Sequence, residues 1–173
     1  MSTVLPFDSA QGKPVATVRR AGHADLPVLG ELGALLMRTH YEFDHQRFMA
    51  CPERAEAAEG YAWFLGSQLE QERVAIFVAE REGEIVGYVY AGIEPQSWKE
   101  LRDECGYIHD VVVHERGRGM GVATQLIQVA AEWLASRGMP RVVLWTAAKN
   151  TKAQRLFERL GFRRTMIEMT REL

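Results

Sequence analysis

The chain has 173 residues, 47% of them hydrophobic and 25% charged, with a formal net charge of −2 at pH 7. These values are typical of one globular domain, and the slightly acidic balance argues against nucleic acid as a partner. Two cysteines without a C-x-x-C pair argue against a structural zinc ion and a disulfide-rich secreted scaffold. We therefore expect no metal and a cytoplasmic location.

The N-terminal segment has no apolar stretch behind a basic region, so it does not resemble a signal peptide. No apolar run reaches the length of a membrane span, and we expect no membrane association. Residues 1–14 are predicted to form an arm, and residues 15–173 a single domain.

A strand is predicted at 15–21, followed by a helix within 23–43 that has Asp25 as its N-cap and Pro27 in its first turn. A second helical stretch covers 53–72, and we expect a break near its glycines, Gly60 and Gly66.

Residues 73–81 and 84–93 are predicted to form a β-hairpin with Gly83 in its turn. A polar connection follows at 94–105, and a strand at 106–113. The second half of the chain alternates helices and strands, with a helix at 121–136, a strand at 141–147, a helix at 150–161 and a final strand at 162–173.

Three successive strands between helices favour a mixed sheet with an antiparallel meander, followed by βα units. The fold class predicted is therefore α/β (α+β), with a mostly antiparallel sheet flanked by helices on both faces. A doubly wound dinucleotide fold is not expected.

The junction between the strand at 106–113 and the next helix carries the sequence Arg116-x-x-Gly119-x-Gly121. Its spacing matches neither the G-x-G-x-x-G dinucleotide fingerprint nor a P-loop. Glycines before a helix N-terminus let backbone N–H groups approach an anion, and Arg116 and Arg118 add positive charge. The pattern indicates a pyrophosphate cradle, although the spacing alone also fits a basic turn without a ligand.

Together with the strand D-V-V-V before it and N-T-K-A-Q-R-L-F-E-R-L-G-F from Asn150 onward, this loop resembles the GCN5-related N-acetyltransferase superfamily. The resemblance covers residues 106–163 in detail. It implies transfer of an acetyl group from acetyl-CoA to an amine, with no metal. It also implies that the cofactor is bound by Val111, Val112, Val113, Arg116, Arg118, Gly119, Met120, Gly121, Val122, Ala123, Thr124, Asn150 and Phe157.

Within that resemblance, the backbone amide of Val111 is expected to stabilise the developing oxyanion. Two familiar catalytic groups are absent. The tyrosine that usually protonates the leaving thiolate is replaced by Phe157, and the glutamate base of one branch of the family is replaced by Trp145. Tyr107, Tyr88 or a water are candidate substitutes for the acid.

The base is therefore expected on the strand at 106–113. Strict alternation would put His109 on the same face as Val111, and Asp110 on the other face. Imidazole has a suitable pKa for a base near pH 7, and Asp110 would orient substrate or water. Each residue could equally be a polar group satisfied by its neighbours. An acyl-enzyme on Cys105 is disfavoured, because the family normally uses direct transfer.

The resemblance implies that the acceptor site is lined by the segments 38–49 and 94–105. The aromatic and acidic residues there suit a cationic amine, and the predicted contacts are Tyr41, Glu42, Asp44 and Tyr107. A solvated loop with ordinary charges explains the first segment equally well.

Two functions remain open: an acetyl-CoA-dependent N-acetyltransferase that acts on a small-molecule or peptide amine, and a CoA-binding sensor without turnover. An RNA-binding module is disfavoured by the acidic charge. The oligomeric state stays open: a homodimer is common in the family that the chain resembles, and the apolar C-terminal strand could support one.

Overall fold

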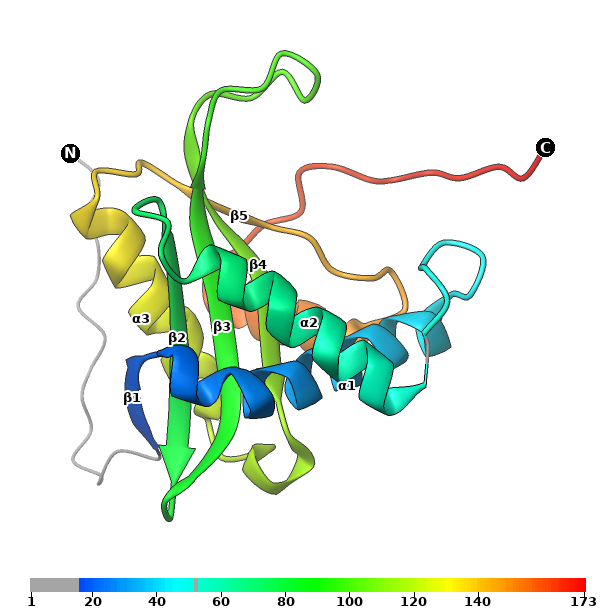
Figure 1. Cartoon of the computed structure of the whole chain (residues 1–173). Coiled ribbons are helices and arrows are strands. Elements are labelled where there is room, and N and C mark those ends of the chain that lie inside the picture. The colour runs from blue at the N-terminus through cyan, green and yellow to red at the C-terminus, as the bar shows by residue number, and fades with distance from the viewer. Residues whose placement is uncertain (1–15, 52) are drawn as a thin grey trace.

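The computed structural model describes residues 16–51 and 53–173, so the expected arm at 1–14 lies outside the described residues. Five strands form one sheet in the order β1-β2-β3-β4-β5, and every neighbouring pair is antiparallel except β4–β5. The strands are β1 (Thr17–Arg20), β2 (Val74–Arg81), β3 (Glu84–Glu94), β4 (Cys105–Val113) and β5 (Val142–Leu144). The predicted mixed, mostly antiparallel sheet is confirmed (Figure 1).

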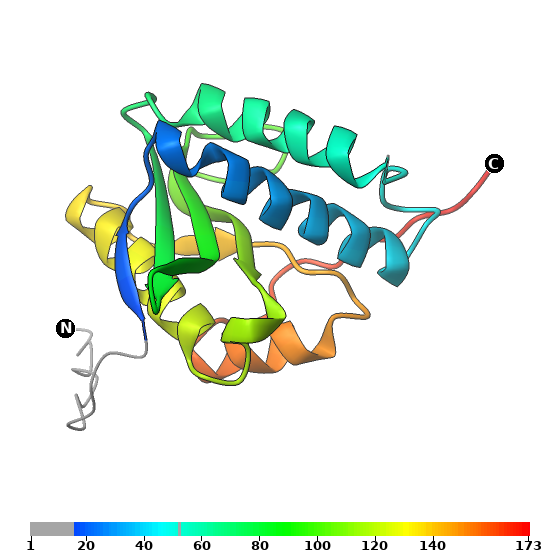
Figure 2. The same ribbon diagram turned by 60° about the horizontal axis from the view of Figure 1, so that its bottom comes forward.

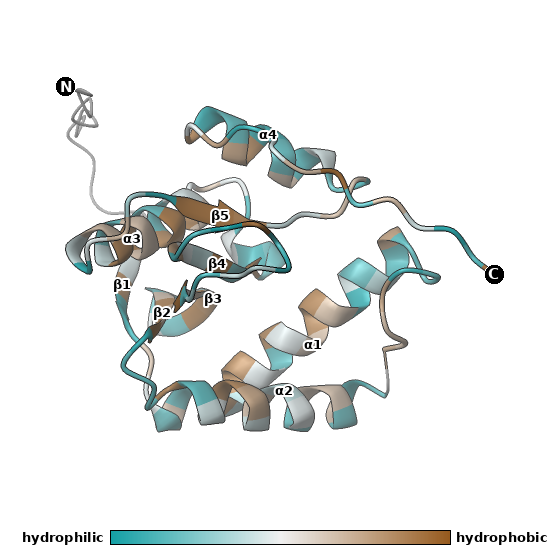
Figure 3. Cartoon of the chain, turned by 90° about the horizontal axis from the view of Figure 1, so that it is seen from above, coloured by the Kyte–Doolittle hydropathy of each residue, from teal (hydrophilic) through white to brown (hydrophobic). Residues whose placement is uncertain are grey.

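Helices cover both faces of this sheet, as expected (Figures 2 and 3). One apolar cluster joins the sheet to the first two helices, and a larger one joins the opposite face to the last two. The helices are α1 (Leu26–Phe43), α2 (Arg54–Gln68), α3 (Val122–Ser136) and α4 (Thr151–Arg159), with short 3-10 helices η1 (His23–Asp25) and η2 (Glu115–Gly117).

The hairpin between β2 and β3 forms where the sequence predicted it. Arg81 pairs with Glu84, and the two intervening residues, Glu82 and Gly83, have φ angles of 54° and 82°. Positive φ at both central residues is the geometry of a two-residue turn that matches the twist of the strands.

The expected break in the second helix is wrong, because α2 runs unbroken through Gly60 and Gly66. A glycine in a helix costs only about 1 kcal/mol, which packing against a neighbouring helix can offset. The predicted C-terminal strand is also wrong. Residues 163–173 are exposed and outside any strand, and Figure 1 shows the segment leading away from the sheet. Ile167 and Met169 would share one face of a strand, but both are exposed and no neighbouring strand in the described part of the chain pairs with them, so the alternation alone does not produce a strand.

None of the helices among the described residues is both long and apolar enough to cross a membrane. Across residues 16–51 and 53–173, no three His, Cys, Asp or Glu side chains gather in a group that could hold a metal ion.

Candidate active site

A β-bulge in β4 determines to which face of the sheet its polar side chains point. Tyr90 pairs with Asp110 but the next residue, Ala91, pairs with Ile108, so His109 is the extra residue. Strict alternation therefore fails at this point. The rings of His109 and Tyr90 stack and Asp110 contacts Tyr61 of α2, whereas Val111 packs in the α3 cluster. The prediction that His109 shares a face with Val111 is wrong: His109 and Asp110 both face α1 and α2.

His109 lies between two tyrosine rings, 4.6 Å from that of Tyr90 and 4.7 Å from that of Tyr107. Its Nε2 atom is 3.1 Å from Oε1 of Glu94, but this contact lacks hydrogen-bond geometry. Among the described residues, Nε2 is the one buried side-chain nitrogen or oxygen without a hydrogen-bond partner. Such groups are rare in folded proteins, and a catalytic role is one of the explanations for them.

The glycine at position 92 makes room for the imidazole. A Cβ atom there would lie 3.2 Å from Nε2 of His109. Burial lowers the pKa of His109 below its ordinary value of 6.5, although the carboxylates of Glu94 and Asp110 oppose part of that shift. His109 is therefore a neutral imidazole at pH 7, which is the protonation state of a base.

Asp110 is half-buried and held by two tyrosines. Its Oδ2 atom accepts hydrogen bonds from the hydroxyls of Tyr61, at 2.8 Å, and Tyr88, at 3.0 Å. Burial raises the pKa of the Asp110 carboxyl above its ordinary value of 3.8, while these hydrogen bonds and the nearby His109 and His40 oppose the shift. The side chain is thus held in one position by elements from both sides of the site.

The raised pKa of Asp110 predicts a stability effect with a definite sign. A group whose pKa is raised by folding contributes stability below its unfolded pKa, and this is lost as pH rises through the folded value. Asp110→Asn, which stays neutral, should match wild type near pH 4 and become the more stable protein as pH rises. Each 1 kcal/mol corresponds to about 2–4 °C in melting temperature for a domain of this size.

Asp25→Asn is the matched control, because Arg19 holds the pKa of the Asp25 carboxyl below its ordinary value. Its contribution is present above the unfolded pKa and lost as pH falls, so this variant should be less stable than wild type at pH 7 and approach it in acid. Thermal melts from about pH 2 to pH 8 measure both differences, because the Asp25 contribution is lost only below the unfolded pKa of 3.8. If Asp110→Asn loses stability relative to wild type as pH rises, the assignment for Asp110 is wrong.

The strands β4 and β5 separate beyond the bulge. They pair only over residues 106–108 and 142–144, while β4 continues to Val113. Because His114 donates its N–H to Val86 of β3, the alternation of an antiparallel ladder turns the N–H groups of Val111 and Val113 away from β3. They face the gap where β5 has ended. Arg118 donates to the carbonyl of Val113 on this same side, at 3.1 Å.

The loop after β4 leads into an uncapped helix N-terminus. Gly121 is the N-cap of α3, with φ of 82° and no side-chain cap, and Gly119 has φ of 75° with open space where a Cβ would be. These backbones favour glycine and leave the first N–H groups of α3 accessible to an anion. In this structure Arg116 donates to Glu84 and to Nδ1 of His114. The predicted cradle therefore has the backbone geometry an anion site needs.

The second motif forms α4. The side chain of Asn150 accepts a hydrogen bond from the N–H of Ala153, which caps the helix. Phe157 is half-buried on the face that packs against the α3 cluster, and its ring meets that of Phe162 edge-on at 5.8 Å. Phe157 thus packs as a core residue, and any contact it makes with a cofactor stays a prediction.

Of the predicted acceptor residues, only Tyr107 lies against His109. Asp44 accepts hydrogen bonds from the backbone of the turn that follows it. Tyr41 and Glu42 border a separate cavity of about 260 Å³ between α1 and the start of α2, lined by Ala34, Arg38, Tyr41, Glu42, Cys51 and Arg54. Within this segment it is His40 that lies close enough to Asp110 to lower the pKa of its carboxyl. Roles for Tyr41, Glu42 and Asp44 in binding substrate remain predictions.

The comparisons with known proteins agree with this geometry. A family model described as Acetyltransferase (GNAT) family matches residues 34–162. This chain belongs to the GNAT acetyltransferase family. Mycothiol acetyltransferase of Thermomonospora curvata is 28% identical over 117 residues, which are 68% of this chain and 35% of that protein. The chain therefore spans about a third of the length of such relatives.

Two crystal structures share the fold of this GNAT protein. A transcriptional regulator from Bacillus halodurans C-125 has a TM-score of 0.71 and 22% identity, covering 91% of this chain and 99% of that one. A GCN5-related N-acetyltransferase from Ralstonia eutropha JMP134 has a TM-score of 0.68 and 21% identity, covering 91% and 97%. At these identities the likeness shows the fold alone.

Sequence reasoning missed several residues that surround His109 and Asp110 in this GNAT protein. They are aromatic or acidic side chains from α2 and β3, namely Tyr61, Phe64, Tyr90 and Glu94. The stretch G-Y-V-Y-A-G-I-E carried a signal, because Tyr88, Tyr90 and Glu94 share one parity on a strand next to the catalytic candidates. No comparable pattern pointed to Tyr61, since a helix brings it to β4.

Proposed function

We propose that the protein is an acetyl-CoA-dependent N-acetyltransferase that moves an acetyl group directly to a primary amine of a small molecule or peptide. The observation that carries this proposal is the gap beside β4. It is bordered by the N–H groups of Val111 and Val113, with the uncapped N-terminus of α3 after β4 and the His109–Asp110 bulge before it.

The residues present fit acetyl-CoA, whose thioester supplies the activated acetyl group. The backbone of residues 119–124, with Arg116 and Arg118, would hold the pyrophosphate, since a glycine-rich helix N-terminus suits an anion. The extended backbone of Val111–Val113 would hold the pantetheine arm, and Asn150 and Phe157 would flank it.

His109 is the proposed base. A primary alkylamine has a pKa near ~10.4, so presenting its free base at pH 7 costs roughly 4–5 kcal/mol. His109 is neutral, half-enclosed and next to Glu94, so a proton received by its imidazole would be stabilised by that carboxylate. Asp110, fixed by two tyrosine hydroxyls, would orient the incoming nitrogen.

Val111 would stabilise the charge that develops on the carbonyl oxygen, because its N–H group faces the gap. No tyrosine stands at position 157 to protonate the leaving sulfur. A thiol with a pKa near ~8.5 leaves tolerably as the thiolate at neutral pH, so the reaction does not require that acid.

The presence of phenylalanine instead of tyrosine at position 157 favours a second candidate, a CoA-binding sensor without turnover. Release of free thiol from acetyl-CoA, measured across a panel of primary amines, separates the two. Thiol release that depends on the amine supports the enzyme. If calorimetry shows that coenzyme A binds but no amine on the panel promotes release, the protein is a sensor.

Several broader expectations are part of this proposal. We place the enzyme in the cytoplasm as a single domain over residues 15–173. The mycothiol acetyltransferases among its relatives support acetyl transfer. This chain spans about a third of the length of those relatives, so their acceptor is not assigned to it. Its acceptor is inferred from the site itself. The homodimer left open by the sequence had rested on a C-terminal strand that the structure lacks.

Substituting Gly121 tests the anion site. Gly121→Asp should lower the affinity for coenzyme A at least about tenfold, or roughly 1.4 kcal/mol, because a carboxylate would occupy the place of the pyrophosphate. Gly138→Asp is the matched control: Gly138 has an almost equal φ of 81°, but it follows the other end of α3. Calorimetric titration should show weakened binding in the first variant only. Equal affinity for coenzyme A in wild type and a folded Gly121→Asp protein would show that this loop does not bind the pyrophosphate.

A further inference from the structure

Six aromatic side chains make a continuous run across the α1–α2 face of the sheet. Successive rings lie 5.8, 5.9, 4.6, 4.7 and 6.0 Å apart. From α2 to the residue after β5, this aromatic strip consists of Tyr61, Phe64, Tyr90, His109, Tyr107 and Trp145. The proposed base is therefore in the middle of the strip. The Trp145 end is accessible, since that side chain is 66% exposed.

Two carboxylates border the strip without a cation to balance them. Within the described part of the chain, Glu94 lies beside the imidazole of His109 and forms no ion pair with a lysine or arginine, and Asp110 pairs with no lysine or arginine either. Several glutamates elsewhere on the surface do form ion pairs with arginines, including Glu31, Glu80, Glu84, Glu100 and Glu104. Because His109 is neutral, the site carries an excess of negative charge in the absence of substrate.

The reacting amine removes this excess only in part. It arrives as an ammonium ion, but its nitrogen must be neutral when it attacks, so its proton stays behind on the imidazole. Asp110 and Glu94 are both half-buried, but two tyrosine hydroxyls already donate to Asp110, whereas no hydroxyl or amide donates to the Glu94 carboxylate among the described residues. Burial is the main cause that raises the pKa of the Tyr107 hydroxyl; Glu100 and, less strongly, Glu94 add to this shift, and Arg102 opposes it. Aromatic rings beside a carboxylate are the chemistry that recognises an alkylammonium group.

We propose that the preferred acceptor is an alkyl diamine or oligoamine whose second, non-reacting cationic group binds between Glu94 and the Tyr107–Trp145 end of the strip. This inference rests on the proposed function, since it names the acceptor of the same reaction. Amino acids are disfavoured acceptors, because their carboxylate would lie against Glu94 without a cation to meet it.

Equilibrium binding tests the inference without requiring turnover. The protein, saturated with coenzyme A, is titrated calorimetrically with 1-aminobutane, 1,4-diaminobutane and 4-aminobutanoate, which differ in the group at the far end. We expect the diamine to bind at least tenfold more tightly than the monoamine, and the amino acid to bind most weakly. Equal dissociation constants for the diamine and the monoamine would overturn the proposal, as would a failure of all three to bind.

Two variants locate the second cation. Glu94→Gln and Trp145→Ala should each reduce the monoamine-to-diamine ratio of dissociation constants toward one. Using the ratio cancels any effect that Glu94 has through His109. Trp98→Ala is the matched control for an exposed tryptophan, since Trp98 is 82% exposed in the β3–β4 connection and outside the strip, and it should keep the wild-type ratio. If both site variants keep the wild-type ratio, the second cation does not bind there and the proposal is wrong.

Failure of this inference and failure of the proposed function give different results. Absence of coenzyme A binding would reject the enzyme, the sensor and this acceptor together, whereas coenzyme A binding with equal dissociation constants for monoamine and diamine would reject this acceptor alone. Turnover of monoamines and diamines at equal kcat/KM, with equal affinities, would keep the acetyltransferase and reject the diamine.

Discussion

Replacing His109 with alanine is expected to lower kcat/KM for an accepted amine at least about a hundredfold at pH 7. General base catalysis typically contributes 10²–10⁴-fold, and His109 is the neutral imidazole of the site, held between two tyrosine rings. Coenzyme A affinity should change little, because the proposed anion site lies beyond the other end of β4. The loss should therefore appear in the transfer step and not in cofactor binding.

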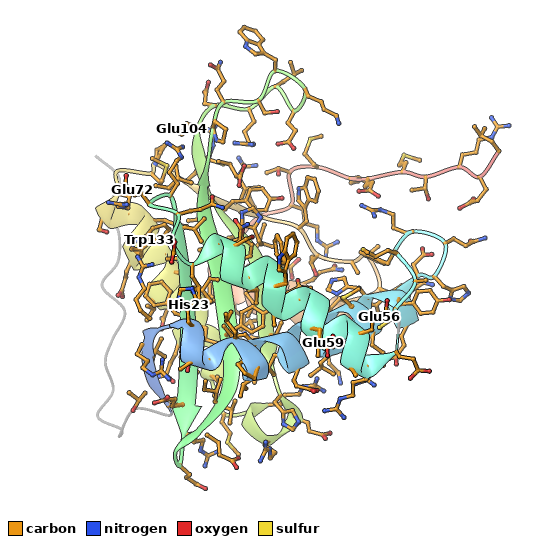
Figure 4. The ribbon with its side chains drawn as sticks, viewed as in Figure 1. His23, Glu56, Glu59, Glu72, Glu104 and Trp133 are labelled. Atoms are coloured by element: carbon orange, nitrogen blue, oxygen red, sulfur yellow. The ribbon has the colours of Figure 1, made fainter. Side chains whose placement is uncertain are left out.

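The pH profile distinguishes a lost base from a damaged structure. A base acts when it is deprotonated, so kcat/KM of the wild type should rise as pH increases through the pKa of His109. Burial lowers that pKa, which places this inflection below 6.5. The inflection should be absent in His109→Ala. His23→Ala is the control, since His23 is exposed in η1, which immediately precedes α1 (Figure 4). If the His109→Ala enzyme keeps both the rate and the inflection, His109 is not the general base, and Asp110 or a bound water becomes the next candidate.

The loop and helix that follow β4 were predictable because their chemistry is local. Gly119 and Gly121 adopt positive φ where the motif requires it, and α3 begins directly after them. The hairpin turn at Glu82–Gly83 was predictable for the same reason. In each case a few adjacent residues determine the backbone, so the sequence contains the necessary information.

The arrangement around His109 was not predictable in this way. The direction of the His109 side chain depends on one extra residue in the pairing of β4 with β3. Such a bulge is a property of two strands together. Without it, His109 and Asp110 would point to opposite faces. The contact between Tyr61 and Asp110 joins residues 49 positions apart, and it depends on the packing of α2 against α1. The final segment shows the converse: the alternation of Ile167 and Met169 suggested a strand, but both side chains are exposed and the segment pairs with no neighbouring strand that the structure describes.

Replacing Gly33 with alanine is expected to destabilise the protein and to impair the site from a distance. A Cβ atom at this position of α1 would lie 2.1 Å from Cδ1 and 2.8 Å from Cβ of Tyr61. A rotation of the ring cannot relieve the second contact, so the two helices must move apart. Overpacking of this kind typically costs about 1–3 kcal/mol. Because the Tyr61 hydroxyl reaches Asp110 through this close approach, separation of the helices should also break that hydrogen bond.

Two variants separate the packing effect from the hydrogen bond. Gly60→Ala is the matched glycine control: a Cβ there meets nothing within 4 Å, so it should be neutral or stabilise α2 by up to about 1 kcal/mol. Tyr61→Phe keeps the ring and removes only the donor to Asp110. Thermal melts and kcat/KM of all three should show a large loss of stability in Gly33→Ala alone, and reduced amine acetylation in both Gly33→Ala and Tyr61→Phe. If Gly33→Ala lowers stability while both variants acetylate amines at the wild-type rate, the Tyr61–Asp110 contact supports the fold and has no part in catalysis.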